Sequence, residues 1–175
     1  MRIDEELAQL SPDADSVLTI GVFDGVHRGH HHLISRLTSD ASSSKRLAGV
    51  VTFRDHPASV LRPDFKPRYL TRLDERVGLI ERLGVDFVVP VTFDLELSRL
   101  SAGGFIDRLR RHLRMSALVI GPGFVMGHKQ EGTEETLVAL GQEIGFSVTA
   151  VGLLMDGERA IRSTMIRQAI AEGDV

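Results

Sequence analysis

The sequence predicts an α/β protein in which helices cover both faces of a parallel sheet. Five runs are almost continuously apolar and rich in valine and isoleucine, as in strands that are buried on both faces. Between them, apolar residues recur at helical spacing. Alternation of the two kinds of segment is typical of a parallel sheet with a helix after each strand. The five strand-like runs are 16–23, 47–53, 85–93, 117–121 and 146–154.

Five helices are expected between and after these strands. The first should begin near Gly29, and the last should run from Ser163 to Ala171. Another follows Thr71, which forms a capping-box pattern with Asp74, and it should stop at Gly84. Segments 104–114 and 134–144 complete the set, the latter with Thr133 as N-cap and Gly145 as stop. The apolar positions at helical spacing are Leu33, Ile34, Leu37, Leu73, Val77, Ile80, Leu83, Ile106, Leu109, Leu113, Leu137, Leu140 and Ile144.

Length and composition predict a single domain over 1–175, with 42% apolar and 26% charged residues. The net charge of −3 gives no general attraction to nucleic acid or membrane. The arginine-rich stretch 108–114 is best explained as the solvated face of a helix. Segment 1–15 is acidic and lacks the apolar core of a signal peptide. The chain has no cysteine, which fits a reducing compartment, and we expect it in the cytoplasm.

Four histidines follow the first strand within six residues, in "GVFDGVHRGHHHLI". His27 and His30 are three residues apart, across the expected start of a helix, so their side chains can face the same side. Gly29 between them allows close approach to the backbone. The free N–H groups of a first helical turn, together with the helix dipole, favour an anion. The pair is therefore predicted to bind phosphate oxygens.

The residues alone leave two further roles open for these histidines, a metal site and an ordinary structural role. A zinc site needs three or four protein ligands, and only Asp24 and His56 could obviously join the pair. A structural role accounts for the spacing of the pair about equally well. His31 and His32 fall at other angles of the helix, and no role is assigned to them. No metal ligand is therefore predicted.

Longer segments identify a family. "HRGH" is the H-x-G-H motif of the nucleotidyltransferase superfamily, and from about residue 15 the chain resembles the adenylyltransferase domain of the bacterial bifunctional riboflavin kinase/FMN adenylyltransferases. In that family a riboflavin kinase barrel follows the position where this sequence ends, so we expect either an excised or a stand-alone domain. The resemblance rests on "GVFDGVHRGHHHLI", "VTFRDHP", "RYLTRLDERVGLIERLGVDFVVPVTFD", "LSAGGFIDRL", "VIGPGFVMGHKQEGT" and "IRSTMIRQAIAEGDV", in that order.

This resemblance implies a Rossmann-like nucleotidyltransferase fold and a reaction in which the phosphate of FMN attacks the α-phosphate of ATP, with Mg²⁺ accompanying ATP. His27 and His30 would be catalytic. Hydroxyls and a guanidinium at a helix start also suit pyrophosphate by their own chemistry, although an N-cap with a solvated arginine is the ordinary alternative. The residues implied for ATP are Gly21, Phe23, Asp24, Gly25, Gly29, Ser163, Thr164 and Arg167; those implied for the acceptor are His56, Pro57, Phe124, Lys129 and Arg162.

The resemblance is weakest in loop 121–133. Each lost charge-assisted hydrogen bond is worth about 1.5–3 kcal/mol, so we expect weakened FMN binding. Two alternatives follow: an adenylyl- or cytidylyltransferase with another phosphate-bearing acceptor, or a nucleotide-binding domain that no longer catalyses. The departures are Gly123 for an acidic or amide residue, Val125 for arginine, Met126 for phenylalanine, Gln130 for arginine, Thr133 for an acidic or amide residue, and, elsewhere, Arg162 for serine and Asp55 for proline.

Overall fold

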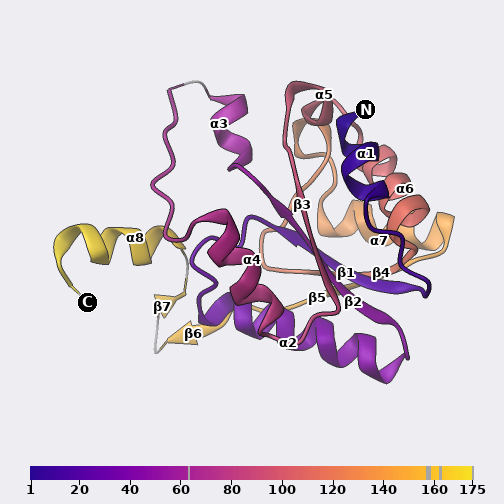
Figure 1. Ribbon diagram of the computed structural model, residues 1–175, viewed down its shortest axis with the longest axis horizontal. Helices are drawn as coiled ribbons and strands as arrows, with labels where there is room; N and C mark the ends of the chain where they lie inside the picture. The colour runs from indigo at the N-terminus through magenta and orange to yellow at the C-terminus, as the bar shows by residue number, and fades with distance from the viewer. Residues whose placement is uncertain (63, 157–158, 162, 175) are drawn as a thin grey trace.

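The computed structural model describes the whole chain except residues 63, 157–158, 162 and 175. Its centre is a five-stranded parallel sheet in the order β3-β2-β1-β4-β5 (Figure 1). The order reverses between β1 and β4, and ligands of such sheets bind beyond the carboxyl ends of the strands at this point. The bounds are β1 Ser16–Gly21, β2 Leu47–Phe53, β3 Phe87–Val91, β4 Met115–Ile120 and β5 Ser147–Ala150.

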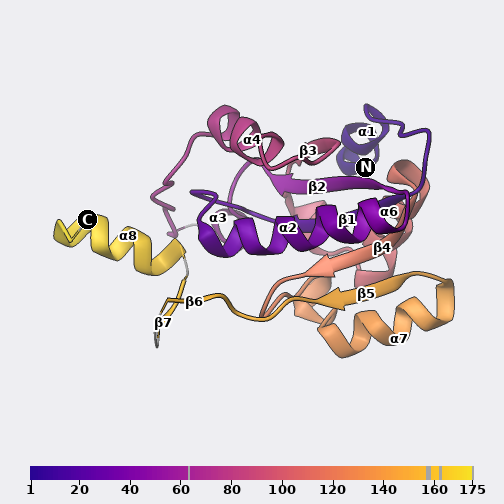
Figure 2. The same cartoon turned by 90° about the horizontal axis from the view of Figure 1, so that it is seen from below.

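Helices cover both faces of the sheet, which confirms the predicted architecture (Figures 1 and 2). One face carries α1 (Arg2–Ala8), α6 (Ala102–Leu113) and α7 (Glu134–Ile144), and the other carries α2 (Arg28–Ser43) and α4 (Leu73–Glu81). Strand side chains alternate between two cores, as the period of two requires. On β1 and β4, the residues Leu18, Ile20, Leu118 and Ile120 belong to the first core, and Val17, Ala117 and Val119 to the second.

Helix boundaries agree with the sequence at one helix and disagree at another. The Thr133 hydroxyl accepts the N–H of Thr136, and Gly145 adopts φ 80°, so α7 begins and ends as predicted. The capping box at Thr71 is wrong: Arg72 is the N-cap of α4 and makes no side-chain cap bond. The Thr71 hydroxyl instead accepts the N–H of Gly25, because the loop after β1 packs against it.

Several elements go beyond what the sequence predicts. The acidic N-terminal segment forms α1, whose Ile3 and Leu7 are buried against the sheet.

The last expected helix is present as α8 (Ser163–Glu172), and it projects away from the sheet in both views (Figures 1 and 2). Among the described residues, every helix is too short or too polar to cross a membrane. The remaining unexpected elements are α3 (Pro57–Leu61), α5 (Leu95–Ser98), the 3₁₀ helix η1 (His128–Gln130), and the hairpin of β6 (Met155–Asp156) and β7 (Arg159–Ala160).

The arginine-rich stretch 108–114 forms the end of α6 and the turn after it, and several of its charges meet carboxylates. The Arg108 Nε atom lies 3.2 Å from Asp4, and the Arg114 Nη2 atom lies 3.1 Å from Asp15. Arg111 and Arg114 are exposed, as the sequence predicts for a solvated face, whereas Arg108 is half-buried between α6 and α1.

Candidate functional site

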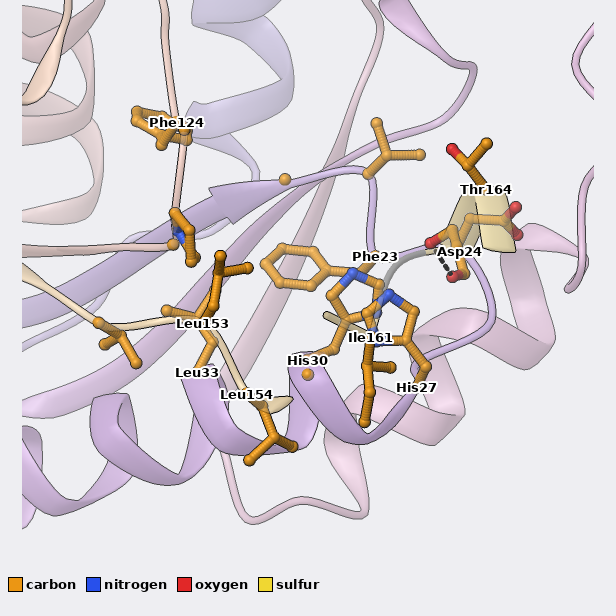
Figure 3. A pocket seen from close by; sticks show the side chains of 18 of the residues that line it. Phe23, Asp24, His27, His30, Leu33, Phe124, Leu153, Leu154, Ile161 and Thr164 are labelled. Atoms are coloured by element: carbon orange, nitrogen blue, oxygen red, sulfur yellow. Dashed lines mark hydrogen bonds between the residues drawn. The ribbon is translucent and has the colours of Figure 1, made fainter. Parts of the chain in front are cut away.

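A cavity of about 640 Å³ opens beyond the carboxyl ends of β1 and β4, at the reversal of strand order (Figure 3). This is the place where a parallel sheet of this topology binds its ligand. Most residues that the sequence implies for catalysis and ATP meet here. Those lining the cavity are His27, His30, Gly21, Phe23, Asp24, Gly29, Ser163, Thr164 and Arg167.

The loop between β1 and α2 has a strained backbone. Phe23 has φ 53° and Val26 has φ 38°, and positive values are costly for residues of this kind. Gly25, with φ 78°, donates its N–H to the Thr71 hydroxyl and does not line the cavity. Gly25 therefore shapes the turn, and its contact with ATP stays a prediction.

Asp24 holds this strained loop in place. Its side chain is 2% exposed and accepts the backbone N–H groups of Leu70 and Thr71, at 2.9 and 3.1 Å. The Nη2 atom of Arg167 lies 2.6 Å from the same carboxylate, and Ser163 Oγ donates to the Asp24 carbonyl at 3.2 Å. One residue thus ties the loop to the segment before α4 and to the start of α8.

The electrostatics of Asp24 favour its charged form. Burial by itself raises the pKa of the Asp24 carboxyl, but the hydrogen bonds from Arg167, Thr71 and Leu70 outweigh that effect and bring the pKa below its usual value. Asp24 and Arg167 consequently form an ion pair inside the cavity wall, and the guanidinium is already at the site where an anion would bind.

His27 and His30 lie face to face. Their ring centroids are 3.6 Å apart with an interplanar angle of 20°, and the Phe23 ring meets His30 edge-on at 5.2 Å (Figure 3). Gly29 leaves room for this arrangement, since a Cβ atom there would lie only 3.1 Å from the His27 ring. The close approach of a ligand to the Gly29 backbone stays a prediction.

Both rings are neutral near neutral pH. Burial and the adjoining His27 ring lower the pKa of His30 to about 3, and burial likewise lowers the pKa of His27. The Nδ1 atoms of both rings are buried without a hydrogen-bond partner among the described residues. Unsatisfied buried polar atoms are rare and costly, so these rings are ready to meet a polar ligand.

His56 lies at the N-terminus of α3 and lines the same cavity. Its Nδ1 accepts the N–H of Ala58 at 3.1 Å, so the neutral ring carries its proton on Nε2. Its backbone N–H donates to the Tyr69 hydroxyl at 2.7 Å. Burial and the charge of Arg167 lower the pKa of His56, which keeps this ring neutral as well.

A second, apolar cavity of about 170 Å³ adjoins the first, since Ile20 and Phe124 line both. Pro57 lines this second cavity, and its contact with an acceptor stays a prediction. Lys129 lines neither cavity, because it is exposed in the left-handed turn of η1, and its predicted acceptor contact lacks support. Arg162 lies outside the described residues. The second cavity is also lined by Phe53, Leu61, Phe93, Leu97, Ser98, Leu100, Phe105, Val125, Met126, Gly127 and Gln130.

Loop 121–133, where the family resemblance is weakest, packs closely against the start of α6. A Cβ atom at Gly127 would lie 2.5 Å from the Ala102 backbone, so the loop approaches α6 as closely as glycine allows. The Glu131 carboxylate accepts the N–H of Ala102 at 2.8 Å. Met126 is buried in the core, whereas Val125 is 41% exposed at the second cavity.

The sequence reasoning missed part of the first cavity, namely the residues that follow β4 and β5. Gly121 and Pro122 come from the end of β4, and the segment 151–154 comes from the end of β5. In Figure 3, Phe124 lies at the opposite end of the cavity from Asp24 and Thr164. The strand ends could have pointed to these residues, because the carboxyl ends of neighbouring parallel strands share one edge of the sheet.

The described residues contain no group of three or more histidine, aspartate or glutamate side chains placed to hold a metal ion. The Asp24 carboxylate is already paired with Arg167, which leaves it poorly suited to join the histidines in a zinc site. A phosphate-bearing ligand therefore fits the donors of this cavity better than a protein-bound metal does.

Known proteins share this architecture and sequence. The bifunctional riboflavin kinase/FMN adenylyltransferase of Escherichia coli (strain K12) is 37% identical over 94% of this chain and 53% of its own length. That of Bacillus subtilis (strain 168) is 35% identical over 93% and 51%. A crystal structure described as a macrolide-efflux protein from Streptococcus pneumoniae superposes with a TM-score of 0.87, at 26% identity, over all of this chain and 56% of that one.

The chain thus spans about half the length of the curated relatives that it matches. The sequence model of the FAD synthetase family matches residues 9–165, which include the lining of both cavities except Arg167. With the H-x-G-H histidines stacked at the switch point of the sheet and this match over most of its length, the chain belongs to the FAD synthetase family.

Proposed function

We propose that this chain transfers the adenylyl group of ATP to FMN, giving FAD and pyrophosphate. A phosphate oxygen of FMN attacks the α-phosphorus of ATP, and the bond from that phosphorus to the oxygen bridging to the β-phosphate breaks. The observation that carries the proposal is the stacked pair of His27 and His30 in the nucleotide cavity, directly beside an apolar cavity of aromatic lining. The cytoplasm is the compartment that we propose.

ATP would occupy the larger cavity with its phosphates against the start of α2 and the start of α8. The N–H groups of two helix starts and the dipoles of both helices favour an anion there. The Thr164 hydroxyl and the Arg167 guanidinium would donate to the leaving pyrophosphate, and the Ser163 hydroxyl would join them on releasing the Asp24 carbonyl. Magnesium would enter with ATP, bound to its phosphates, because the described residues offer no carboxylate cluster for it.

FMN would place its ring system in the smaller cavity. The side chains of Phe53, Phe93 and Phe105 supply apolar and aromatic contact for a flat heteroaromatic ring. Phe124 and Ile20 line both cavities, so the phosphate of FMN would reach the α-phosphate of ATP past these two residues. Catalysis would then depend mainly on alignment of the two substrates and on charge stabilisation.

His30 would stabilise the charge that develops on the transferring phosphate. The ring is neutral in the structure, because burial and His27 lower its pKa to about 3. A polyanion in contact with it favours the protonated form and so raises its pKa. We expect His30 to donate a hydrogen bond to the phosphate in its bound state, with the stacked His27 holding the orientation of the ring.

The test is pyrophosphate release with each of the four ribonucleoside triphosphates and with FMN, nicotinamide mononucleotide or phosphopantetheine as acceptor. Riboflavin is the matched control, since it lacks the attacking phosphate. FAD detected by chromatography only with ATP, FMN and magnesium together supports the proposal. Turnover with another phosphate-bearing acceptor would support the second candidate function, a transferase that uses that acceptor in place of FMN. The departures from the resembling family at Gly123 and Val125 favour this candidate.

A further inference from the structure

Arg76 is a buried charge that the reaction above does not use. Its side chain on α4 is 1% exposed. Its Nη2 atom donates to the carbonyl of Phe53 at 2.7 Å and to that of Arg54 at 3.3 Å. Its Nε and Nη1 atoms are buried without a hydrogen-bond partner among the described residues.

Such a residue is a poor choice for stability alone. A buried guanidinium with donors left unsatisfied pays a desolvation penalty, and two hydrogen bonds to carbonyls offset only part of it. Burial lowers the pKa of Arg76, which reflects that penalty. One turn further along α4, the same face carries Ile80, which is fully buried in the core. An apolar residue would therefore suit position 76 if packing were its purpose.

The two carbonyls that Arg76 binds lie where β2 ends and the chain turns toward both cavities. Phe53 and Pro57 line the apolar cavity, and His56 lines the nucleotide cavity. Segment 53–57 therefore forms part of the wall of both cavities. Its far end is held by Tyr69, whose hydroxyl accepts the N–H of His56. Its near end is held by the Arg76 guanidinium.

We propose that Arg76 is a positioning residue that fixes segment 53–57 between the two cavities, so that the two substrates meet in line. This inference rests on the proposed function, because in-line attack needs both substrates placed at once. A displacement of about 1 Å in such an arrangement can cost on the order of 10²-fold in rate. A forked guanidinium can hold two successive carbonyls in fixed directions, whereas an ammonium acts as a single point charge.

The decisive variant is Arg76→Met, which keeps the length of the side chain and removes its donors. We expect kcat for FAD formation to fall on the order of 10²-fold, with KM for ATP and for FMN within about threefold of wild type. The thermal midpoint should fall modestly, because the carbonyls of Phe53 and Arg54 lose their donor. Arg76→Lys should recover part of the rate, to roughly tenfold below wild type. Arg82→Met, at an exposed position just beyond α4, is the matched control and should behave as wild type.

A folded Arg76→Met variant with wild-type kcat would overturn the inference, and so would full activity in Arg76→Lys if the Met variant fails to fold. A second readout separates this inference from the proposed function. The ring resonances of His56 in NMR spectra should shift in Arg76→Met and stay unchanged in Arg82→Met, whether or not FMN is the acceptor. If the wild type makes no FAD, the proposed function fails, and unshifted His56 resonances in a folded Arg76→Met variant would overturn the positioning role separately.

Discussion

The two adjoining cavities, the proposed nucleotide side and the proposed acceptor side, are built by different means. On the nucleotide side, a strained loop is fastened by a buried carboxylate that binds two backbone N–H groups and an arginine. On the acceptor side, loop 121–133 is fastened by close backbone contact at Gly127 and by Glu131 at the start of α6. The proposed nucleotide side therefore depends mainly on polar side chains. The proposed acceptor side depends mainly on a small residue at a close backbone contact, together with one carboxylate.

The two sides differ in how firmly their side chains are held. Val125 is 41% exposed, and a Cβ at Gly123 would meet open space. Four separate donors, in contrast, converge on the buried carboxylate of Asp24. A substitution at Val125 should therefore disturb the packing less than a substitution at Asp24.

His30→Ala should produce the largest effect on the nucleotide side. If His30 stabilises charge that develops in the transition state, kcat should fall on the order of 10²–10³-fold while the Kd for ATP changes little. Pre-steady-state pyrophosphate release and calorimetry with a non-hydrolysable ATP analogue measure the two quantities. His32→Ala, at an exposed position of the same helix, is the control. An equal loss in both quantities would assign His30 to ground-state binding.

Arg167→Ala should weaken ATP binding, with a smaller change than His30→Ala causes in kcat. A charge-assisted contact to phosphate is worth about 1.5–3 kcal/mol, which corresponds to roughly 10- to 150-fold in Kd. Calorimetric titration with MgATP measures it, and the exposed Arg82→Ala is the control. Unchanged binding would mean that the guanidinium serves only Asp24, its partner at 2.6 Å in this structure.

The buried state of His30 predicts a pH dependence of stability. Its folded pKa is about 3, well below the 6.5 of an exposed histidine. Between these values the unfolded chain binds a proton that the folded chain does not, so stability falls as pH falls from about 6.5 toward 3. His30→Gln should flatten this slope by up to about 1.4 kcal/mol per pH unit. Urea unfolding at several pH values measures it, and identical slopes in both proteins would contradict the burial of the ring.

Local patterns are enough to predict the sheet, the expected helices and the histidine pair. Apolar runs show the strands, and the spacing of His27 and His30 around a glycine is visible in a few residues. The role of Thr71 is different, because its hydroxyl serves Gly25, which lies 46 positions away in the chain. Contacts over such separations leave no local pattern, so helical spacing alone makes a capping box the natural interpretation.

The same reason applies to Arg76 and to α1. Arg76 sits among the charges of an amphipathic helix in the sequence, and only the fold shows that it is buried beneath the end of β2. The acidic composition of segment 1–15 makes α1 hard to predict from the sequence, although Ile3 and Leu7 give this helix one apolar face. Its buried Glu6 binds Thr92 near the end of β3, a contact that spans 86 positions.

Restoring polar groups on the proposed acceptor side should change FMN affinity, and this is the smallest effect predicted for the molecule. Val125→Arg and Gly123→Asp each add a group that the family resemblance implies at this position, and each should tighten FMN binding by about tenfold, or roughly 1.4 kcal/mol. Val125 is exposed at the apolar cavity, so an arginine has room there. Gly123 has φ 67°, which strains any side chain, and aspartate tolerates this conformation better than most. Quenching of flavin fluorescence on titration gives the Kd for wild type, for each variant and for the pair. Val138→Arg, on the exposed surface of α7, is the control for an added charge. Tight FMN binding by the unmodified chain would show that this loop already holds the acceptor without those groups. Flavin binding by neither the wild type nor the double variant, with normal ATP binding, would remove FMN as the acceptor and leave ATP as the one proposed substrate that still stands.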